Sequence, residues 1–365
     1  MQYKQEALND WYELEKLCWR NDGYLMCVAC ESDDSGGWQE FISVWKHPNG
    51  ITKTPTKTKI LIDESSRRPR DFNPLITFNG MLCNRETDTV VLGGEAEWDP
   101  RPDRDYSGFV ITISLETGQV QNKQKSFDVV DHVEEMNSFG GVIGLTHRSV
   151  FTYDIRTKST RPNVLKKTED IYTTLSFDRS SGHYFVVGNT QGEAMIFDIR
   201  NAKEPITYLW EGRKTDDDDD LIDHLNWKGK YIFVSVDRGA EPDANFFWDL
   251  EKSQKIDVSL ENLSDGGRSL VQDSEWIGEH IVIKVTSGSL FSISPNSTDV
   301  RRIDFISEAQ ESDENEGFRV ENSPGTFGIK NIAFCNETMQ LAGLNKKNIF
   351  IWSHDKCQPQ TTSNN

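Results

Sequence analysis

Short apolar segments recur in pairs along the whole chain, and the members of each pair are separated by a turn rich in Gly, Asp or Asn. The second member of each pair ends in an aromatic or aliphatic residue. Seven segments have this form: Phe41–Trp45, Phe109–Ile113, Ser149–Tyr153, Glu193–Phe197, Asn245–Trp248, Ser289–Ile293 and Lys347–Trp352. Apolar runs of this length, bounded by turn residues, are typical of β-strands joined in hairpins. The pattern therefore predicts an all-β protein built from seven repeated units.

The first strands of these hairpins and their spacing define the size of the repeat. They are expected at Leu25–Ala29, Thr89–Leu92, Val142–Leu145, Tyr184–Val187, Tyr231–Val234, His280–Ile283 and Met339–Ala342. The ends of the second strands are separated by 68, 40, 44, 51, 45 and 59 residues. Three of these six intervals match the period of about 40–45 residues of a four-stranded propeller blade. Because the strands are apolar on both faces, each small sheet is expected to pack between two neighbours.

The ends of these strands resemble the WD-repeat family, whose signature is an aromatic residue followed by Asp. That dipeptide is kept at Trp248-Asp249, Tyr153-Asp154 and Phe197-Asp198. Trp45 and Trp352 keep only the aromatic residue, and the Gly-His pair usual near the start of a blade is missing. The resemblance implies a single seven-bladed β-propeller over residues 1–356, followed by a polar tail over residues 357–365. It assigns no subfamily.

The two ends of the chain are expected to meet in the last blade. The chain stops soon after Trp352, so the seventh unit lacks an outer strand of its own. We expect a segment within residues 2–14 to fill that edge and close the ring. Closure of this kind removes exposed sheet edges, which otherwise promote aggregation.

Charge limits the classes of partner. The chain has 40 Lys and Arg against 59 Asp and Glu, which gives a formal net charge of −19. An acidic protein is poorly suited to bind nucleic-acid phosphates or an anionic membrane directly, because both need a cationic face. We expect protein partners with Lys/Arg-rich segments and a place in a hetero-complex. No signal peptide or membrane-spanning run is found and cysteines are few, so the nucleus and/or cytoplasm is the expected location.

Acidic loops gather on one predicted face of the propeller. The top face is defined here as the face that carries the connections between blades and the loops between second and third strands. The candidate partner-binding residues on it are Asp216, Asp217, Asp218, Asp219, Asp220, Glu311, Asp313, Glu314, Trp98 and Trp38. Carboxylates beside an exposed indole suit a basic peptide, through charge-assisted hydrogen bonds and cation–π contact. The alternative is that these acidic runs are solvated loops that bind nothing.

A second candidate surface lies on the opposite, bottom face. Asp154 and Arg156 follow the second strand of the third hairpin, and Asp198 and Arg200 occupy the same place in the fourth. These paired Asp-x-Arg endings resemble those of WD-repeat substrate receptors, which dock on the adaptor of a cullin-4-type ubiquitin ligase. In both copies Tyr or Phe replaces the Trp of that motif. The alternative is a local ion pair within each motif.

The sequence lacks the common catalytic and phosphate-binding motifs. No nucleophile elbow, His-Glu-x-x-His helix or phosphate-binding loop occurs. Asp131-His132 and Asp223-His224 are adjacent on expected inner strands, where each His is expected to bond a backbone group or a neighbouring hydroxyl. Cys27 and Cys30 lie three apart on an expected strand and so point in opposite directions. We therefore expect a non-enzymatic scaffold subunit without cofactor or metal; the alternatives are the ligase receptor and a reader of basic histone-like tails.

Overall fold

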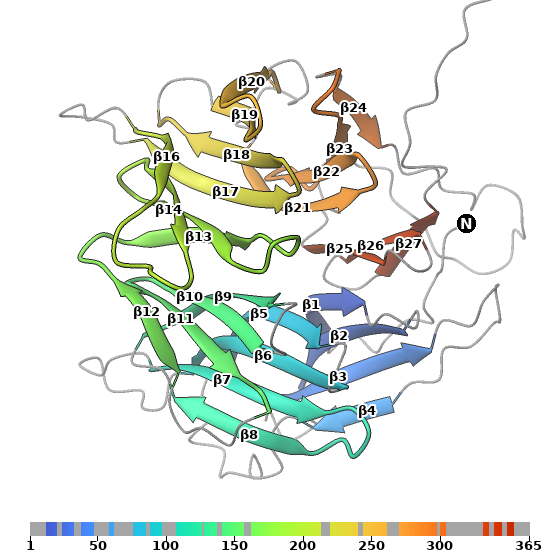
Figure 1. Ribbon diagram of the computed structural model, residues 1–365. Helices are drawn as coiled ribbons and strands as arrows, with labels where there is room; N and C mark the ends of the chain where they lie inside the picture. The colour runs from blue at the N-terminus through green and yellow to red at the C-terminus, as the bar shows by residue number, and fades with distance from the viewer. Residues whose placement is uncertain are drawn as a thin grey trace, which may run out of the picture.

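The computed structural model consists of β-strands joined by turns and loops (Figure 1). It describes residues 12–19, 24–32, 38–46, 58–61, 76–84, 88–96, 107–125, 128–136, 141–156, 162–212, 220–239, 244–260, 270–297, 300–303, 331–335, 339–344 and 349–353. Within these ranges no helix is long and apolar enough to cross a membrane.

Strands that follow one another in sequence pair antiparallel to form seven separate sheets. Blades one to four consist of β1 (Tyr12–Trp19), β2 (Tyr24–Ser32), β3 (Trp38–Lys46) and β4 (Thr58–Leu61); β5 (Ile76–Asn84), β6 (Thr89–Ala96), β7 (Ser107–Ser114) and β8 (Val120–Lys125); β9 (Val130–Met136), β10 (Gly141–Thr146), β11 (Ser149–Asp154) and β12 (Asn163–Lys167); and β13 (Tyr172–Phe177), β14 (Tyr184–Asn189), β15 (Ala194–Asp198) and β16 (Thr207–Trp210).

The remaining three blades repeat this order, and the last of them has three strands within the described residues. They consist of β17 (Leu221–Lys228), β18 (Tyr231–Asp237), β19 (Ala244–Asp249) and β20 (Gln254–Val258); β21 (Val271–Ile277), β22 (His280–Val285), β23 (Leu290–Ile293) and β24 (Val300–Ile303); and β25 (Asn331–Cys335), β26 (Gln340–Leu344) and β27 (Ile349–Ser353). The predicted hairpins correspond to the second and third strands of the seven blades. The all-β class and the number of repeats are therefore confirmed.

The first strand of each blade lies innermost, and these strands follow one another around a centre (Figure 1). The last blade lies beside the first. Backbone N–H of Leu17 donates to Asn331 Oδ1 at 3.0 Å, and Trp19 Nε1 donates to the carbonyl of Ala333 at 3.0 Å. The seven sheets thus form a propeller whose first and last inner strands are hydrogen-bonded through side chains.

Of the segment 2–14, which is predicted to complete the last blade, the structure describes only residues 12–14. Tyr12–Leu14, the end of the segment expected to complete the last blade, lies instead in β1 and pairs with β2 of blade one. These three residues therefore do not supply the closing strand. Residues 2–11 lie outside the described residues, as does the tail 357–365, so pairing of that earlier segment with β27 stays a prediction.

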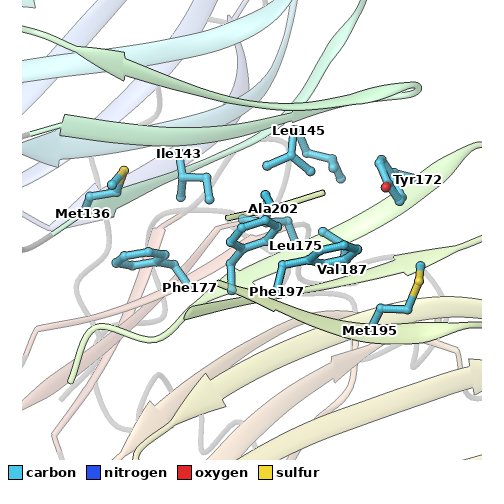
Figure 2. Close-up of a cluster of buried hydrophobic side chains, with 12 residues drawn as sticks. Met136, Ile143, Leu145, Tyr172, Leu175, Phe177, Val187, Met195, Phe197 and Ala202 are labelled. Carbon is cyan, nitrogen blue, oxygen red and sulfur yellow. The ribbon is translucent and has the colours of Figure 1, made fainter. Parts of the chain in front are cut away.

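Apolar side chains fill the spaces between neighbouring blades. Between blades three and four the buried cluster includes Leu145, Phe177 and Phe185, all at most 1% exposed. Phe185 and Phe197 are cross-strand partners whose rings stack with centroids 5.4 Å apart. Figure 2 shows Phe197 within this cluster, together with Leu145 and Phe177. Strands with two apolar faces can bury both only when a sheet stands on each side. The ring arrangement follows from this requirement.

Side chains from one blade cap the inner edge of the next. An inner strand has one unpaired edge, and buried N–H groups there need acceptors. Phe177 N–H donates to Glu134 Oε2 at 3.0 Å, and Ile332 N–H donates to Asp273 Oδ2 at 2.9 Å. Trp227 N–H likewise donates to Ser176 Oγ of the preceding blade at 3.0 Å. The inner edges are thus joined by polar contacts, whereas the blade faces are joined by apolar ones.

Candidate functional site

A cavity of about 690 Å³ runs through the centre of the propeller and is lined by the inner strands of all seven blades. Its described lining includes six carboxyl groups and three Lys or Arg side chains. The six are Asp131, Glu134, Glu135, Asp223, Asp273 and Glu275, and the three are Lys16, Arg179 and Lys228. The centre of the molecule is therefore polar and rich in acid.

Six of the seven inner strands carry a one-residue β-bulge at the same place. The register against the second strand skips Glu15, Asn79, Asp131, Thr173, Asp223 and Gln272. All six are polar, and the last five line the cavity. Because a bulge turns a side chain out of the regular alternation, the five residues that line the cavity form a polar ring at one end of it. We call it the bulge ring.

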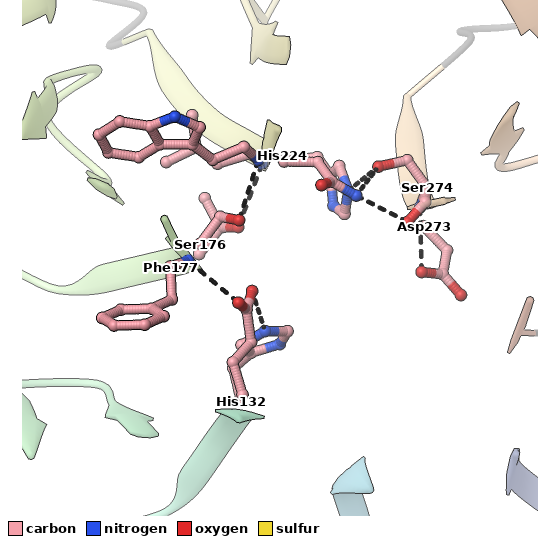
Figure 3. A network of polar contacts seen from close by, with 11 residues as sticks. His132, Ser176, Phe177, His224, Asp273 and Ser274 are labelled. Carbon is pink, nitrogen blue, oxygen red and sulfur yellow. Dashed lines mark hydrogen bonds and ion pairs between the residues drawn. The ribbon is translucent and has the colours of Figure 1, made fainter. Parts of the chain in front are cut away.

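His132 and Glu134 form a linked pair on β9 (Figure 3). His132 Nε2 lies 3.1 Å from Glu134 Oε1, and the other oxygen accepts the Phe177 N–H of the next blade. Burial opposes ionisation of Glu134, but the hydrogen bonds from His132 and Phe177 and the charges of His132 and Arg179 lower the pKa of this carboxyl overall. Glu134 is thus held as a carboxylate with both oxygens occupied.

His224 has the structural role predicted for it. Its Nε2 lies 2.8 Å from Ser274 Oγ of the next blade, and Asn226 Nδ2 donates to the same hydroxyl at 2.9 Å (Figure 3). Burial lowers the pKa of His224 to about 4, so the ring is neutral at pH 7. A neutral imidazole can accept the Ser274 proton. The expected bond to a neighbouring hydroxyl is confirmed, whereas His132 bonds a carboxylate on its own strand instead.

Glu275 stands apart from the other carboxyl groups in the cavity. It makes no hydrogen bond or ion pair within the described part of the chain. Burial, then the negative charge of Asp273, raises the pKa of Glu275 to about 8, although Arg179 and Lys228 act in the opposite direction. The carboxyl is therefore mostly protonated at pH 7.

The structure describes the part of the top face that lies between blades two and three. His147, in the turn after β10, lies 3.9 Å from Asp128 and 3.4 Å from Asp131. Burial, together with the negative charges of Asp128 and Glu95, raises the pKa of Asp131 to about 6, against the opposing effect of His147 and His132. Carboxylates from two neighbouring blades are thus close enough to repel each other at this face.

One of the predicted acidic residues is not available on the surface. Asp220 is 4% exposed and lies 3.8 Å from Arg238 Nε. A Cβ on Gly192 would approach the Asp220 Cβ to 2.7 Å, and Gly192 has φ of 72°. Both Gly192 and Arg238 belong to loops between second and third strands. The connection between blades four and five, which ends at Asp220, therefore lies on the same face as these loops, as predicted. The exposure expected for Asp220 is corrected: the structure buries it as part of this junction.

The other predicted top-face residues lie largely outside the described residues. They are Asp216, Asp217, Asp218, Asp219, Glu311, Asp313, Glu314 and Trp98. Trp38 is the first residue of β3, and only its backbone is described. Their role in binding stays a prediction.

Both Asp-x-Arg motifs fold into local ion pairs on the bottom face. Arg156 donates from Nε and Nη2 to the two carboxylate oxygens of Asp154, at 3.0 and 3.1 Å. Arg200 makes the same fork to Asp198, with distances of 2.9 and 2.6 Å. The hydrogen bond from Arg200 lowers the pKa of Asp198 to about 2. The local pairing that was the alternative is therefore present, and the side chains of Arg156 and Arg200 remain 51% and 60% exposed.

Sequence reasoning missed the features inside the cavity. Glu134, Asp273 and Glu275 lie on inner strands whose apolar positions are too few to stand out beside the hairpins. A signal was present, because a polar pair follows an apolar residue in Asp131-His132, Asp223-His224 and Gln272-Asp273. Among the described residues, no group of three or more His, Cys, Asp or Glu side chains is arranged to hold a metal ion.

No protein-family profile matches the sequence, and no curated protein matches it significantly. Solved structures do match. One, from the crystal structure of the mitotic checkpoint complex, has a TM-score of 0.60 at 13% identity and covers 97% of this chain and 93% of that one. Another, from the COPII coat assembled on membranes, has a TM-score of 0.64 at 11% identity and covers 97% of this chain. This chain spans 48% of that protein's length.

At such low identity the two similarities show the fold alone. They agree with the seven antiparallel sheets in supporting a β-propeller. Because one fold carries many unrelated functions, function must be argued from the surfaces of this chain.

Proposed function

We propose that this protein is a non-enzymatic scaffold subunit of an intracellular multiprotein complex, and that it holds protein partners through its acidic top face and its rim. We also propose that it belongs to the WD-repeat family, because an aromatic-Asp dipeptide ends the third strand in blades three, four and five. The matched structures come from multiprotein assemblies, and this is consistent with a scaffold role.

The observation that carries the proposal is the crowding of negative charge at the described part of the top face. The negative charges of Asp128 and Glu95 act unfavourably on Asp131 there, and they add to burial, the larger cause, in raising the pKa of Asp131. A Lys- or Arg-rich segment would relieve this repulsion and gain charge-assisted hydrogen bonds. The net charge of −19 supports the same class of partner.

The acidic loops extend this surface in the proposal. Residues 216–219 lead directly into Asp220, whose contacts with Gly192 and Arg238 tie that connection to the top face. Residues 311, 313 and 314 lie in another connection between blades, and Trp38 and Trp98 would supply apolar anchors. Asp220 itself is left out, because it is buried.

The test compares two charge-matched variants of the full chain. The first replaces Asp216, Asp217, Asp218 and Asp219 with Ser; the control replaces four exposed acids away from the top face, Glu116, Glu204, Glu251 and Asp257. Proteins captured by the wild type from its own cells are identified by cross-linking and mass spectrometry. Partners bound through basic segments should be lost from the first variant and kept by the control, and their binding should weaken with salt. Equal capture by both variants would refute the acidic-loop surface.

A second candidate function has its own observation. Arg156 and Arg200 are exposed at equivalent places on consecutive blades, and each guanidinium is held in a fixed orientation by its Asp. Paired arginines of this kind suit docking on the adaptor of a cullin-4-type ubiquitin ligase. The double variant Arg156→Ala/Arg200→Ala should lose the adaptor in a pull-down. If the wild type captures no adaptor, or the variant captures as much, this function is excluded.

A narrower form of the first proposal is recognition of basic histone-like tails by the top face. Titration of the wild type and the two charge variants with an unmodified Lys/Arg-rich tail peptide separates this form from general scaffolding. Salt-dependent binding that only the first variant loses supports it. Absence of binding excludes it and leaves the scaffold proposal to the cross-linking result.

A further inference from the structure

The outer strands of the blades differ in charge. In the described part of the chain, six blades have a fourth strand, and that strand is the last in its sheet (Figure 1). The open edge of a sheet can pair with a strand of another chain, and Lys or Arg side chains on it discourage this pairing. Five of the six strands carry such residues: Lys59 in β4, Lys123 and Lys125 in β8, Lys166 and Lys167 in β12, Lys255 in β20, and Arg301 and Arg302 in β24. The fourth strand of blade four, β16, contains no charged residue.

The start of β16 also exposes apolar side chains. Ile206, which directly precedes the strand, is 57% exposed, and Tyr208 is 42% exposed. Thr207 between them is exposed as well. Ile, Thr and Tyr are among the residues that strands favour most. Residues 206–208 therefore combine the composition of a buried strand with the exposure of a surface.

The backbone of this segment has hydrogen-bonding groups that face outward. Ile206 N–H donates to the carbonyl of Ile196 in β15 at 2.7 Å. Because successive residues of a strand point their N–H and C=O groups to opposite sides, those of Thr207 face the open edge. An extended peptide that pairs there would bond both groups. Ile206 and Tyr208 are two residues apart, so they share one face of the sheet and can contact the side chains of an added strand.

Negative charge surrounds the end of β16 that lies nearer the top face. Glu211 directly follows the strand and is exposed. Burial, then the charge of Asp170, raises the pKa of Tyr172 to about 12, and Glu193 and Tyr208 act on it in the same direction. The carboxylates of Asp170 and Glu193 are thus close to the group that Tyr208 also approaches. A Lys or Arg side chain on an added strand is complementary to this end.

We propose that the open edge of β16 binds an extended segment of a partner protein by strand addition, and that this segment has β-branched residues at its centre and Lys or Arg at the end beside Glu211. A second copy of this chain is the poorer occupant, because each copy carries a net charge of −19 and the two repel. The inference rests on the proposed function, since it assigns the rim of blade four as one of the partner-binding surfaces of the scaffold. It does not involve residues 216–219.

Three dye-labelled peptide amides test the edge by fluorescence anisotropy with the full chain. The first is Lys-Thr-Val-Thr-Val-Thr-Lys, the second has Glu in place of both Lys residues, and the third has Pro in place of the central Thr. The first peptide should bind, and its affinity should fall with salt. The second should bind about tenfold more weakly or less, because its carboxylates meet those around β16. The third should lose binding to the same extent, because Pro has no N–H to pair and disrupts an added strand.

Matched variants locate the binding edge. Ile206→Lys gives this edge the charge that the other outer strands carry, and Thr207→Pro removes the N–H that faces the open edge. Each should weaken binding of the Lys-flanked peptide about tenfold or more. Val164→Lys adds the same charge at a side chain 45% exposed on β12, and it should bind the peptide as the wild type does. Urea unfolding of each variant is measured first, and if Thr207→Pro does not fold, Ile206→Lys decides.

Several outcomes overturn the proposal. They are no binding of the Lys-flanked peptide at about 1 mM, equal binding of the Pro peptide, and binding that Ile206→Lys leaves unchanged. A wild-type dimer that Ile206→Lys dissociates, seen by analytical ultracentrifugation, assigns the edge to a second copy instead.

The variant with Ser at residues 216–219 separates this site from the acidic loops. It should keep the Lys-flanked peptide, and loss of the peptide would place its binding at the loops and overturn the proposal. If the peptide does not bind the wild type while the Ser variant still loses its partners in the cross-linking experiment, only the rim site is refuted.

Discussion

The blade faces and the inner edges of the blades both join neighbouring blades, but the faces do so by apolar contacts and the inner edges by hydrogen bonds. Between blades three and four, side chains such as Phe177, Phe185 and Phe197 meet in a buried apolar cluster. At the inner edges, Glu134 of blade three accepts a backbone N–H of blade four, and Thr174 and Ser176 of blade four accept backbone N–H groups of blade five. Apolar contacts stabilise without fixing direction, whereas hydrogen bonds fix register. The propeller uses the first to hold its blades and the second to align them.

The apolar faces mainly stabilise the fold, whereas the inner edges also hold polar groups that are available for binding. The described side chains of the apolar clusters between blades are packed against one another and buried. The inner edges contain groups with unmet bonding capacity, such as Asp131 Oδ2. Four substitutions, ordered from the largest expected effect, test the comparison.

The largest loss is expected in the apolar cluster. Phe197→Ala removes a ring that is 1% exposed and stacks on Phe185. Truncation of a buried Phe should lower the free energy of unfolding by about 3–5 kcal/mol, measured by urea denaturation. Ile206→Ala, at a side chain 57% exposed on the rim, is the matched control and should change little. If both variants lowered the free energy of unfolding equally, the prediction that packing between blades contributes most to stability would be wrong.

Glu275→Gln should stabilise the fold, in contrast to Phe197→Ala. A carboxyl group whose pKa is raised in the folded state destabilises the protein as pH rises from the unfolded pKa of 4.5 to the folded value of about 8. Glu275→Gln has no carboxyl group at this position, so its folding stability does not fall with pH for this reason. Each pKa unit is worth about 1.4 kcal/mol, so the rise from 4.5 to about 8 sets an upper limit of about 5 kcal/mol on the gain in stability of the variant at pH 8–9, and at pH 4 the difference should vanish. A constant difference across this range would contradict the prediction.

Ser176→Ala tests a single bond at the inner edge. The substitution leaves the Trp227 N–H, buried beside the next strand, without its acceptor. An unsatisfied buried donor costs about 1–3 kcal/mol, read from urea unfolding. Ser176→Thr keeps the hydroxyl and serves as control; if it destabilises as much as Ser176→Ala, the loss comes from packing and not from the bond.

Arg156→Ala should have the smallest effect on stability. Its ion pair with Asp154 is solvent-exposed, and such pairs contribute little. The midpoint of urea unfolding should stay unchanged within error, whereas loss of a bottom-face partner would appear in the pull-down. A clear drop in the midpoint would assign the Asp-x-Arg motif a structural role instead.

Much of the fold could be predicted from hydrophobic pattern alone. The hairpin strands such as Phe109–Ile113 and Tyr231–Val234 are apolar on both faces, and this dictates burial between two sheets whatever their order in space. The inner strands were harder to find, because polar residues such as Glu134 and Glu275 interrupt their apolar pattern. The outer strands, such as Asn163–Lys167, are short, largely exposed and contain few apolar residues, so the apolar pattern does not reveal them.

The candidate site was predicted less completely than the fold. The Asp-x-Arg ion pairs were foreseen as an alternative, because residues two apart after a strand can close a local fork. The burial of Asp220 could not be foreseen, since its sequence neighbours are all acidic and its partner Arg238 comes from another loop.

The sequence by itself determined that this protein is an all-β chain of seven repeated hairpin units with a strong negative charge, because these properties depend on local pattern and composition. Only the tertiary structure decided that Asp131, Glu134 and Glu275 share one cavity, and which of their oxygens have partners. Contacts of this kind join strands that lie about 40 to 140 residues apart, and hydrogen-bonding capacity is met or left unmet only when distant strands are brought side by side.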